Sequence, residues 1–173
     1  MINHIKYFLI IILLLLTTNS YSQNIAYANL DKIVKNSTSG KKIIEYYQKI
    51  NTKIVLEIRN KEKNIKEKER SLISQKNILE ATEYNKKVNL LREEINIFNN
   101  ENKTKLNGIN QDKEKSIQSF MSQVNKILND YAKKKNIDII LSSQQIVIGK
   151  SELDVTNDIL KIVNEKINNF KIN

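Results

Sequence analysis

The chain has 173 residues and contains no Pro, no Cys and no Trp, with only three Gly and one His. An average chain of this length would carry about nine prolines, so their absence argues against a loop-rich β-sandwich and favours long helices. The single histidine, His4, lies in a segment that we expect export to remove. Without His or Cys, the mature chain lacks the usual zinc ligands and every His-dependent catalytic triad.

The net charge is +10, from 29 Lys and Arg against 19 Asp and Glu. Arg occurs only at Arg59, Arg70 and Arg92, so Lys carries nearly all of the positive charge. Specific recognition of bases and phosphates favours the guanidinium fork of Arg, and we therefore expect no nucleic-acid partner. The charge suits an acidic or amphipathic partner, or contact with an anionic membrane surface.

Residues 1–22 have the three-part pattern of a secretory signal peptide. A short polar start precedes the apolar run YFLIIILLLL at Tyr7–Leu16, and small residues lie just before a cleavage point at Gln23. An uncleaved membrane anchor is the alternative, but ten residues are about half of the ~20 that span a bilayer. We predict cleavage, and a periplasmic location where the envelope has an outer membrane.

Strand signals lie at both ends of the mature chain, in residues 23–38 and 136–173. The segment Asn24–Val34 predicts a short strand, with Ile25 and Tyr27 on one face, that leads into a helix. Near the C-terminus, the β-rich runs Ile137–Leu141 and Gln145–Ile148 flank a Ser-Ser-Gln turn, which predicts a β-hairpin.

A final helix is expected after this hairpin. Asp154 and Thr156 are the candidates for its N-terminal cap, and apolar residues at helical spacing continue to about Phe170.

Between these ends, residues 39–135 are rich in Lys, Glu, Asn, Ile and Leu and predict helix. Two stretches carry apolar residues at coiled-coil spacing. The first contains Ile54, Ile58, Ile65, Leu72 and Leu79, and the second contains Tyr84, Val88, Leu91, Ile95 and Phe98. A single helix of this length would extend about 145 Å, so one long parallel coiled coil is an alternative to a chain that folds back.

A folded-back chain is favoured because the two apolar stretches pair in one antiparallel register. The numbers of the pairs Leu72–Leu91, Ile65–Phe98 and Ile54–Ile109 add up to the same total, as antiparallel pairing requires. The predicted hairpin turns near residues 77–85. In this register Lys61 lies opposite Asn102, which predicts a poorly packed polar layer and an arm that bends there.

The hairpin would bury little apolar area alone, so we expect the two chain ends to form a small sheet that the last helix covers. So small a body is poorly stabilised by its own core and favours oligomerisation, as a dimer or a trimer. The candidate oligomerisation residues are the apolar side chains of the predicted strands: Ile25, Tyr27, Ile137, Ile139, Leu141 and Val147.

The order of these segments resembles the Skp/OmpH family of periplasmic chaperones. The resemblance rests on the start IAYANLDKI, the Lys/Glu-rich hairpin with the tip NILEATEYNKKV, and the ending YAKKKNIDIILSSQQIVIGKSELDVTNDIL. It implies a mainly α fold with a small β-barrel body, in which three chains hold helical arms around a cavity. It also implies a holdase that binds unfolded outer-membrane proteins without ATP and prevents their aggregation.

Apolar residues outside the two apolar stretches are the candidates for client contact, and they are Ile50, Leu56, Ile73, Leu90 and Ile97. We expect no enzyme, metal site or cofactor, because the neighbouring carboxylates are explained by Lys pairing on helices or by the start of a helix. A structural coiled-coil protein, acting as an envelope adaptor or spacer, is the alternative function.

Overall fold

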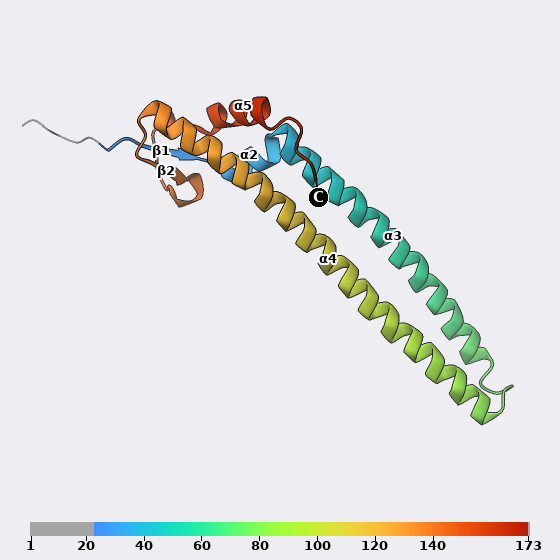
Figure 1. Cartoon of the computed structure of the whole chain (residues 1–173). Helices are drawn as coiled ribbons and strands as arrows, with labels where there is room; N and C mark the ends of the chain where they lie inside the picture. The colour runs from blue at the N-terminus through green and yellow to red at the C-terminus, as the bar shows by residue number, and fades with distance from the viewer. Residues whose placement is uncertain (1–22, 173) are drawn as a thin grey trace, which may run out of the picture.

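Two long helices dominate the computed structural model, which describes residues 23–172. Helix α3 (Thr38–Ser74) and helix α4 (Ala81–Lys135) project side by side from a small body (Figure 1). The body contains strands β1 (Ile25–Ala28) and β2 (Ile139–Ser142). The chain is thus mainly helical with a small sheet, as the sequence predicted. The predicted signal peptide lies outside the described residues.

Shorter elements complete the body. Helix α2 (Leu30–Asn36) follows β1, and helix α5 (Thr156–Lys166) ends the described secondary structure. Two 3₁₀ turns, η1 (Ser143–Gln145) and η2 (Ser151–Leu153), lie between β2 and α5.

Local signals explain where the long helices begin and end. The Ser37 side chain accepts a hydrogen bond from the N–H of Gly40 and caps α3. The chain reverses direction in a turn at residues 75–80, so that α4 runs back along α3 (Figure 1). Helix α4 ends at Lys135 and is capped by Asn136, whose φ of 52° lies in the left-handed region that Asn tolerates better than most residues.

The sheet joins the two ends of the described chain. Strands β1 and β2 pair in parallel, and Ile25 lies beside Ile139 while Tyr27 lies beside Leu141. Alternation along β1 buries the small residues Ala26 and Ala28 and leaves Ile25 and Tyr27 on the opposite face. The larger apolar residues of this strand therefore point away from the core of their own chain.

The core lies where the last turns of α4 meet the other elements. Helix α4 buries Phe120, Val124, Ile127 and Tyr131 at steps of four and three, the spacing of one helix face. This face packs against side chains of α2, α3 and α5, which are Ile33, Ile43, Tyr47, Ile159 and Val163. The core thus holds both chain ends against the body end of the long helices.

The predicted β-hairpin is wrong. Strand β2 begins and ends later than expected, and Gln145–Ile148 forms no strand. The 3₁₀ turn η1 follows β2 directly, and Ile146 donates its N–H to the carbonyl of Ser143, which turns the chain away from β2. A β-rich composition does not make a strand when the backbone lacks a partner edge.

The other predicted boundaries differ by smaller amounts. The predicted tip at residues 77–85 overlaps the start of α4, which begins at Ala81. The last helix is Thr156–Lys166, so Asp154 precedes it and Phe170 follows it.

Candidate binding surface of the helix pair

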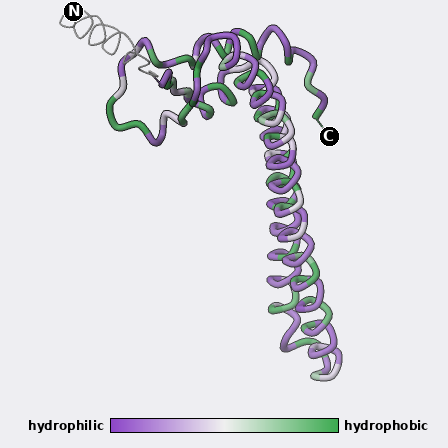
Figure 2. The backbone as a smooth tube through the Cα atoms, turned by 60° about the vertical axis from the view of Figure 1, so that its left-hand side comes forward, coloured by the Kyte–Doolittle hydropathy of each residue, from purple (hydrophilic) through white to green (hydrophobic). Residues whose placement is uncertain are grey.

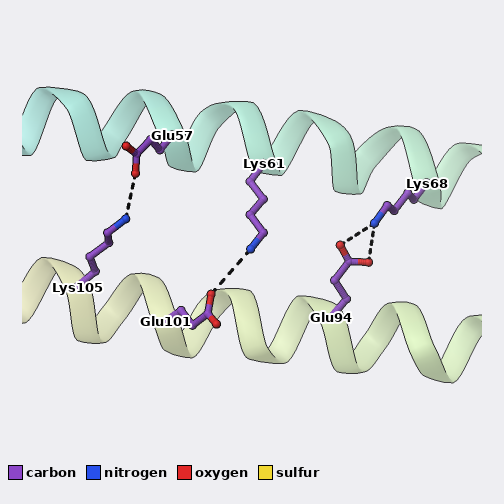
Figure 3. Close-up of polar contacts among 6 residues, drawn as sticks. All are labelled: Glu57, Lys61, Lys68, Glu94, Glu101 and Lys105. Atoms are coloured by element: carbon purple, nitrogen blue, oxygen red, sulfur yellow. Dashed lines mark hydrogen bonds and ion pairs between the residues drawn. The ribbon is translucent and has the colours of Figure 1, made fainter.

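Three ion pairs join α3 to α4 along the middle of the helix pair (Figure 3). The Nζ of Lys68 lies 2.7 and 2.8 Å from the two carboxylate oxygens of Glu94. The Nζ of Lys105 lies 2.9 Å from an oxygen of Glu57. A third pair joins Lys61 and Glu101, at 3.8 Å. From one pair to the next, the residue number rises on α3 and falls on α4, as it does when two helices run in opposite directions.

These pairs act in water rather than in a dry interior. About half of each side chain is exposed, so solvent and salt screen the attraction. The hydrogen bond from Lys105, together with its charge, lowers the pKa of the Glu57 carboxyl. The pairs therefore set the register of the helices more than they add to stability.

An open cavity of about 740 Å³ lies between the helices beside two of these pairs. Its apolar lining comes from Ile58 and Phe98, and the Nζ of Lys61 lies 5.5 Å from the centre of the Phe98 ring. Asn102, which the predicted register placed opposite Lys61, also lines this cavity. The helix pair is thus poorly packed where a polar layer was predicted. The two lysines of this layer are nevertheless paired, Lys61 with Glu101 and Lys105 with Glu57.

Hydrophobic and hydrophilic residues are interspersed along both long helices (Figure 2). Four of the five candidate contact residues are more than half exposed: Leu56, Ile73, Leu90 and Ile97. Ile50 differs, because it is partly buried and packs against the core. Ile50 therefore offers a client less free surface than the other four candidates, since α3 is still close to the body at that point.

A second groove, of about 380 Å³, lies nearer the turn between the helices. Its apolar lining is Leu72, Leu90 and Leu91, and charged side chains including Lys68 and Glu94 surround it. Leu90 thus belongs both to the exposed apolar set and to a groove. Shallow grooves with an apolar floor and a charged rim suit weak contacts with an extended chain.

Three of the six candidate oligomerisation residues are exposed on the body. Ile25 and Ile139 are neighbours in the sheet, 39% and 45% exposed, whereas Tyr27, Ile137 and Leu141 are partly buried. Val147 is 97% exposed in the loop that follows η1. Ile25, Ile139 and Val147 give the body an exposed apolar surface, whereas Ile137 packs against the core.

Asp154 and Thr156 link the start of α5 to β1. The Asp154 carboxylate accepts hydrogen bonds from the N–H and the hydroxyl of Thr156, and the N–H of Asn29 donates to that hydroxyl over 2.8 Å. Thr156 is buried and is the first residue of the helix.

Sequence reasoning missed several exposed apolar residues. Ile148 is 92% exposed beside Val147, because the expected strand does not form there. Ile78 is exposed in the turn between the long helices. The run Ile146–Ile148 was the available signal, but its β-rich composition predicted a strand rather than an exposed loop. The acidic partners of Lys61 and Lys68 were also missed.

The described residues, 23–172, include neither a metal-binding cluster nor a helix that could span a membrane. No group of three or more Asp, Glu, His or Cys side chains gathers there in a way that could hold a metal ion. In that same range, no helix combines the length and the apolar character needed to cross a membrane.

Comparison with known proteins identifies the family. The sequence model of the family described as outer membrane protein (OmpH-like) matches residues 24–163. The chain belongs to the OmpH-like family. Its match covers both strands, both long helices and most of α5, including the grooves between the long helices. No curated protein sequence matches the chain.

A solved structure shares the fold of this OmpH-like chain. The crystal structure of a candidate outer membrane chaperone (OmpH-like) from Caulobacter crescentus CB15 superposes with a TM-score of 0.75. The alignment covers 87% of this chain and 89% of that one, at 11% sequence identity. At this identity the likeness shows the fold, while family membership supports a chaperone role at the level of the family.

Proposed function

We propose that this OmpH-like protein is an ATP-independent holdase of the periplasm. It binds unfolded outer-membrane proteins between the helical arms of an oligomer and prevents their aggregation. The observation that carries this proposal is the set of exposed apolar side chains, Leu56, Ile73, Leu90 and Ile97, spread along two long helices. Family membership adds the chaperone class and an outer-membrane connection.

The chemistry of such clients fits this surface. Strands of β-barrels alternate apolar and polar residues, and they aggregate through unpaired edges and apolar faces. Separate apolar side chains on a Lys-rich surface can contact such a chain at many points without recognising one sequence. Each contact is weak, but many contacts made together retain the client. The excess of Lys attracts acidic clients and suits an anionic membrane surface.

The proposed assembly is a homotrimer whose body forms from the chain ends of all three subunits. Support comes from the outer face of the sheet, where Ile25 and Ile139 are adjacent and exposed, and from Val147 in the following loop. A two-stranded sheet is marginal by itself and is stabilised by further strands or by packing. Three helix pairs would then surround a cavity, with each antiparallel pair serving as one arm.

A structural adaptor or spacer is the second candidate function. It would require a well-packed arm and a defined partner surface. The open cavity beside Lys61 and Phe98 favours the chaperone, because loosely packed arms can adapt to clients of different size.

Suppression of aggregation tests the proposal. An outer-membrane β-barrel protein is diluted from urea with and without the mature chain, and light scattering is followed. We expect scattering to fall at a stoichiometric ratio of the assembled protein and without ATP. Unchanged scattering would contradict the chaperone function and favour the adaptor.

A pair of matched variants tests the surface itself. Replacing Leu90 and Ile97 together by Ser removes two apolar contacts, so we expect weaker suppression, about tenfold in the apparent affinity for the client. The control replaces the adjacent exposed residues Asn89 and Asn96 by Ser, on the same helix. Equal suppression by both double variants would exclude Leu90 and Ile97 from client contact.

A further inference from the structure

The chain does not end with α5 but returns to the body end of the long helices (Figure 1). We call residues 167–172 the C-terminal strap. Ile167 is buried, and Ile172 packs against the core. The ring of Phe170 meets the ring of the fully buried Phe120 edge-on, with centroids 5.7 Å apart. The strap therefore anchors itself to α4 through apolar contacts.

The strap and the end of α5 also hold the first turn of α3. The N–H of Thr38 donates to Oδ1 of Asn164 over 2.8 Å, and the Ser39 hydroxyl donates to the carbonyl of Ile167. The first N–H groups of a helix and its last carbonyls have no partners within that helix. Here a side chain of α5 accepts from the first N–H of α3, and a side chain of α3 donates to a carbonyl at the end of α5.

Electrostatics favours the same junction. The N-terminal end of a helix carries partial positive charge and the C-terminal end carries partial negative charge. Helix α3 has no acidic residue in its first turn to offset its positive end. The Ile167 carbonyl at the end of α5 accepts a hydrogen bond from Ser39 in that first turn, which places partial negative charge beside the positive end of α3, while Lys166 in the last turn of α5 offsets part of it.

Only one residue, Ser37, separates α2 from α3, whereas α4 runs unbroken from the helix pair into the body. The start of α3 is thus the point where the helix pair can change its spacing without breaking a helix. The residues that hold this point, Asn164, Ile167 and Phe170, lie beyond residue 163, where the match to the family ends. These contacts at the start of α3 therefore involve residues outside the segment that the family model covers.

We propose that the C-terminal strap locks the start of α3 against α4 and thereby fixes the spacing of the two long helices. Phe170 is the apolar anchor, while Asn164 and the carbonyl of Ile167 hold the first turn of α3. Since α3 carries Leu56 and Ile73 while α4 carries Leu90 and Ile97, the lock also sets how far apart these side chains lie.

Distance measurement on the mature chain tests the lock. The mature chain contains no Cys, so spin labels can be attached to cysteines introduced at the exposed positions Lys63 on α3 and Lys103 on α4. In Phe170→Ala we expect a broader distance distribution that extends to longer distances. Amides in the first turns of α3 should also exchange hydrogen about tenfold faster. No client is present, so the outcome does not depend on the proposed function.

Two further variants make the result decisive. Asn164→Ala removes one hydrogen-bond acceptor and leaves the apolar anchor, so it should broaden the distribution even if Phe170→Ala fails to fold. Lys171→Ala changes the exposed neighbour of Phe170 and should leave the distribution unchanged. Unchanged distances in both Phe170→Ala and Asn164→Ala would overturn the proposal, as would equal broadening in Lys171→Ala.

Discussion

Two glycines in helices lie in opposite surroundings. A Cβ added at Gly40 would lie 1.9 Å from the carbonyl oxygen of Val34, so α2 and α3 approach here more closely than any side chain allows. A Cβ at Gly108 would meet nothing within 4 Å. The first glycine is required by packing, while the second only weakens a helix.

Alanine substitutions at these positions should therefore have opposite effects. Gly40→Ala should lower the free energy of unfolding by about 1–3 kcal/mol, because backbone must move to relieve the clash. Gly108→Ala should raise it by about 0.5–1 kcal/mol, since Ala is the better helix former. Urea denaturation of the two variants checks both signs, and a loss of stability in Gly108→Ala would contradict this account.

Tyr131 provides a pH-dependent contact between α4 and α5. Its hydroxyl donates to Oδ2 of Asp158 over 2.6 Å, and its side chain is buried. Burial, followed by the hydrogen bond to Asp158 and the charge of that carboxylate, raises the pKa of Tyr131 from 10.0 to about 12. The folded state thus keeps the proton that the unfolded chain loses near pH 10.

This contact should stabilise the fold below pH 10 and stop doing so as the pH rises toward 12. Tyr131→Phe should cost about 1 kcal/mol near neutral pH. The difference in stability between the wild-type chain and the variant should shrink above pH 10. A difference that stays constant from pH 7 to pH 11.5 in urea titrations would contradict the raised pKa.

Sequence patterns correctly predict the burial of residues that recur at regular spacing along one helix. The apolar positions Ile54, Ile65 and Phe98 were predicted from spacing alone and are buried. By contrast, the hydrogen bond from the N–H of Thr38 to the side chain of Asn164 joins residues 126 apart in the sequence. No local pattern contains that pairing, because it arises only when both helix ends reach the same side of the core.

At the level of elements, the helix pair has a weak middle. Ion pairs and an open cavity take the place of apolar packing around Lys61, whereas Ile54 and Ile65 are buried on either side. Fraying and bending concentrate where few apolar contacts hold a structure together.

We therefore expect amides in residues 58–64 and 100–106 to exchange hydrogen faster than those near Ile54. High salt should increase this difference, because it screens the pairs that cross the gap. Lys61→Leu should slow exchange in the same segments by extending the apolar packing, while Lys63→Leu on the exposed side should not. Uniformly slow exchange along both helices would contradict a bending site.

Strands were harder to predict than helices. The first strand was predicted with Ile25 and Tyr27 on one face, and the structure has that strand at Ile25–Ala28, but spacing alone did not show that the opposite face, Ala26 and Ala28, is the buried one. Gln145–Ile148 has the composition of a strand yet forms a turn and an exposed loop. A helix satisfies its backbone internally, whereas a strand needs a partner edge that the sequence does not identify.

At the level of the whole molecule, the apolar outer surface of the body predicts assembly. Replacing Val147 and Ile148 together by Lys puts like charges into the proposed subunit contact, so we expect light scattering to give the mass of a monomer. Ile78→Lys, at the far end of the helix pair, should leave the trimer intact. A trimeric mass for the Val147/Ile148 variant would place the subunit contact elsewhere.

The parallel pairing of β1 with β2 has a consequence for the order of folding. Ile25 pairs with Ile139, so the sheet closes a loop of more than a hundred residues. The N–H of Asn29, just after β1, also needs the hydroxyl of Thr156 as its acceptor. During synthesis, which starts at the N-terminus, β1 is complete long before its partner strand exists, whereas α3 and α4 can begin to form from neighbouring turns. We therefore expect the body to fold last, so that Ile25 waits for its partner strand while most of the chain is made.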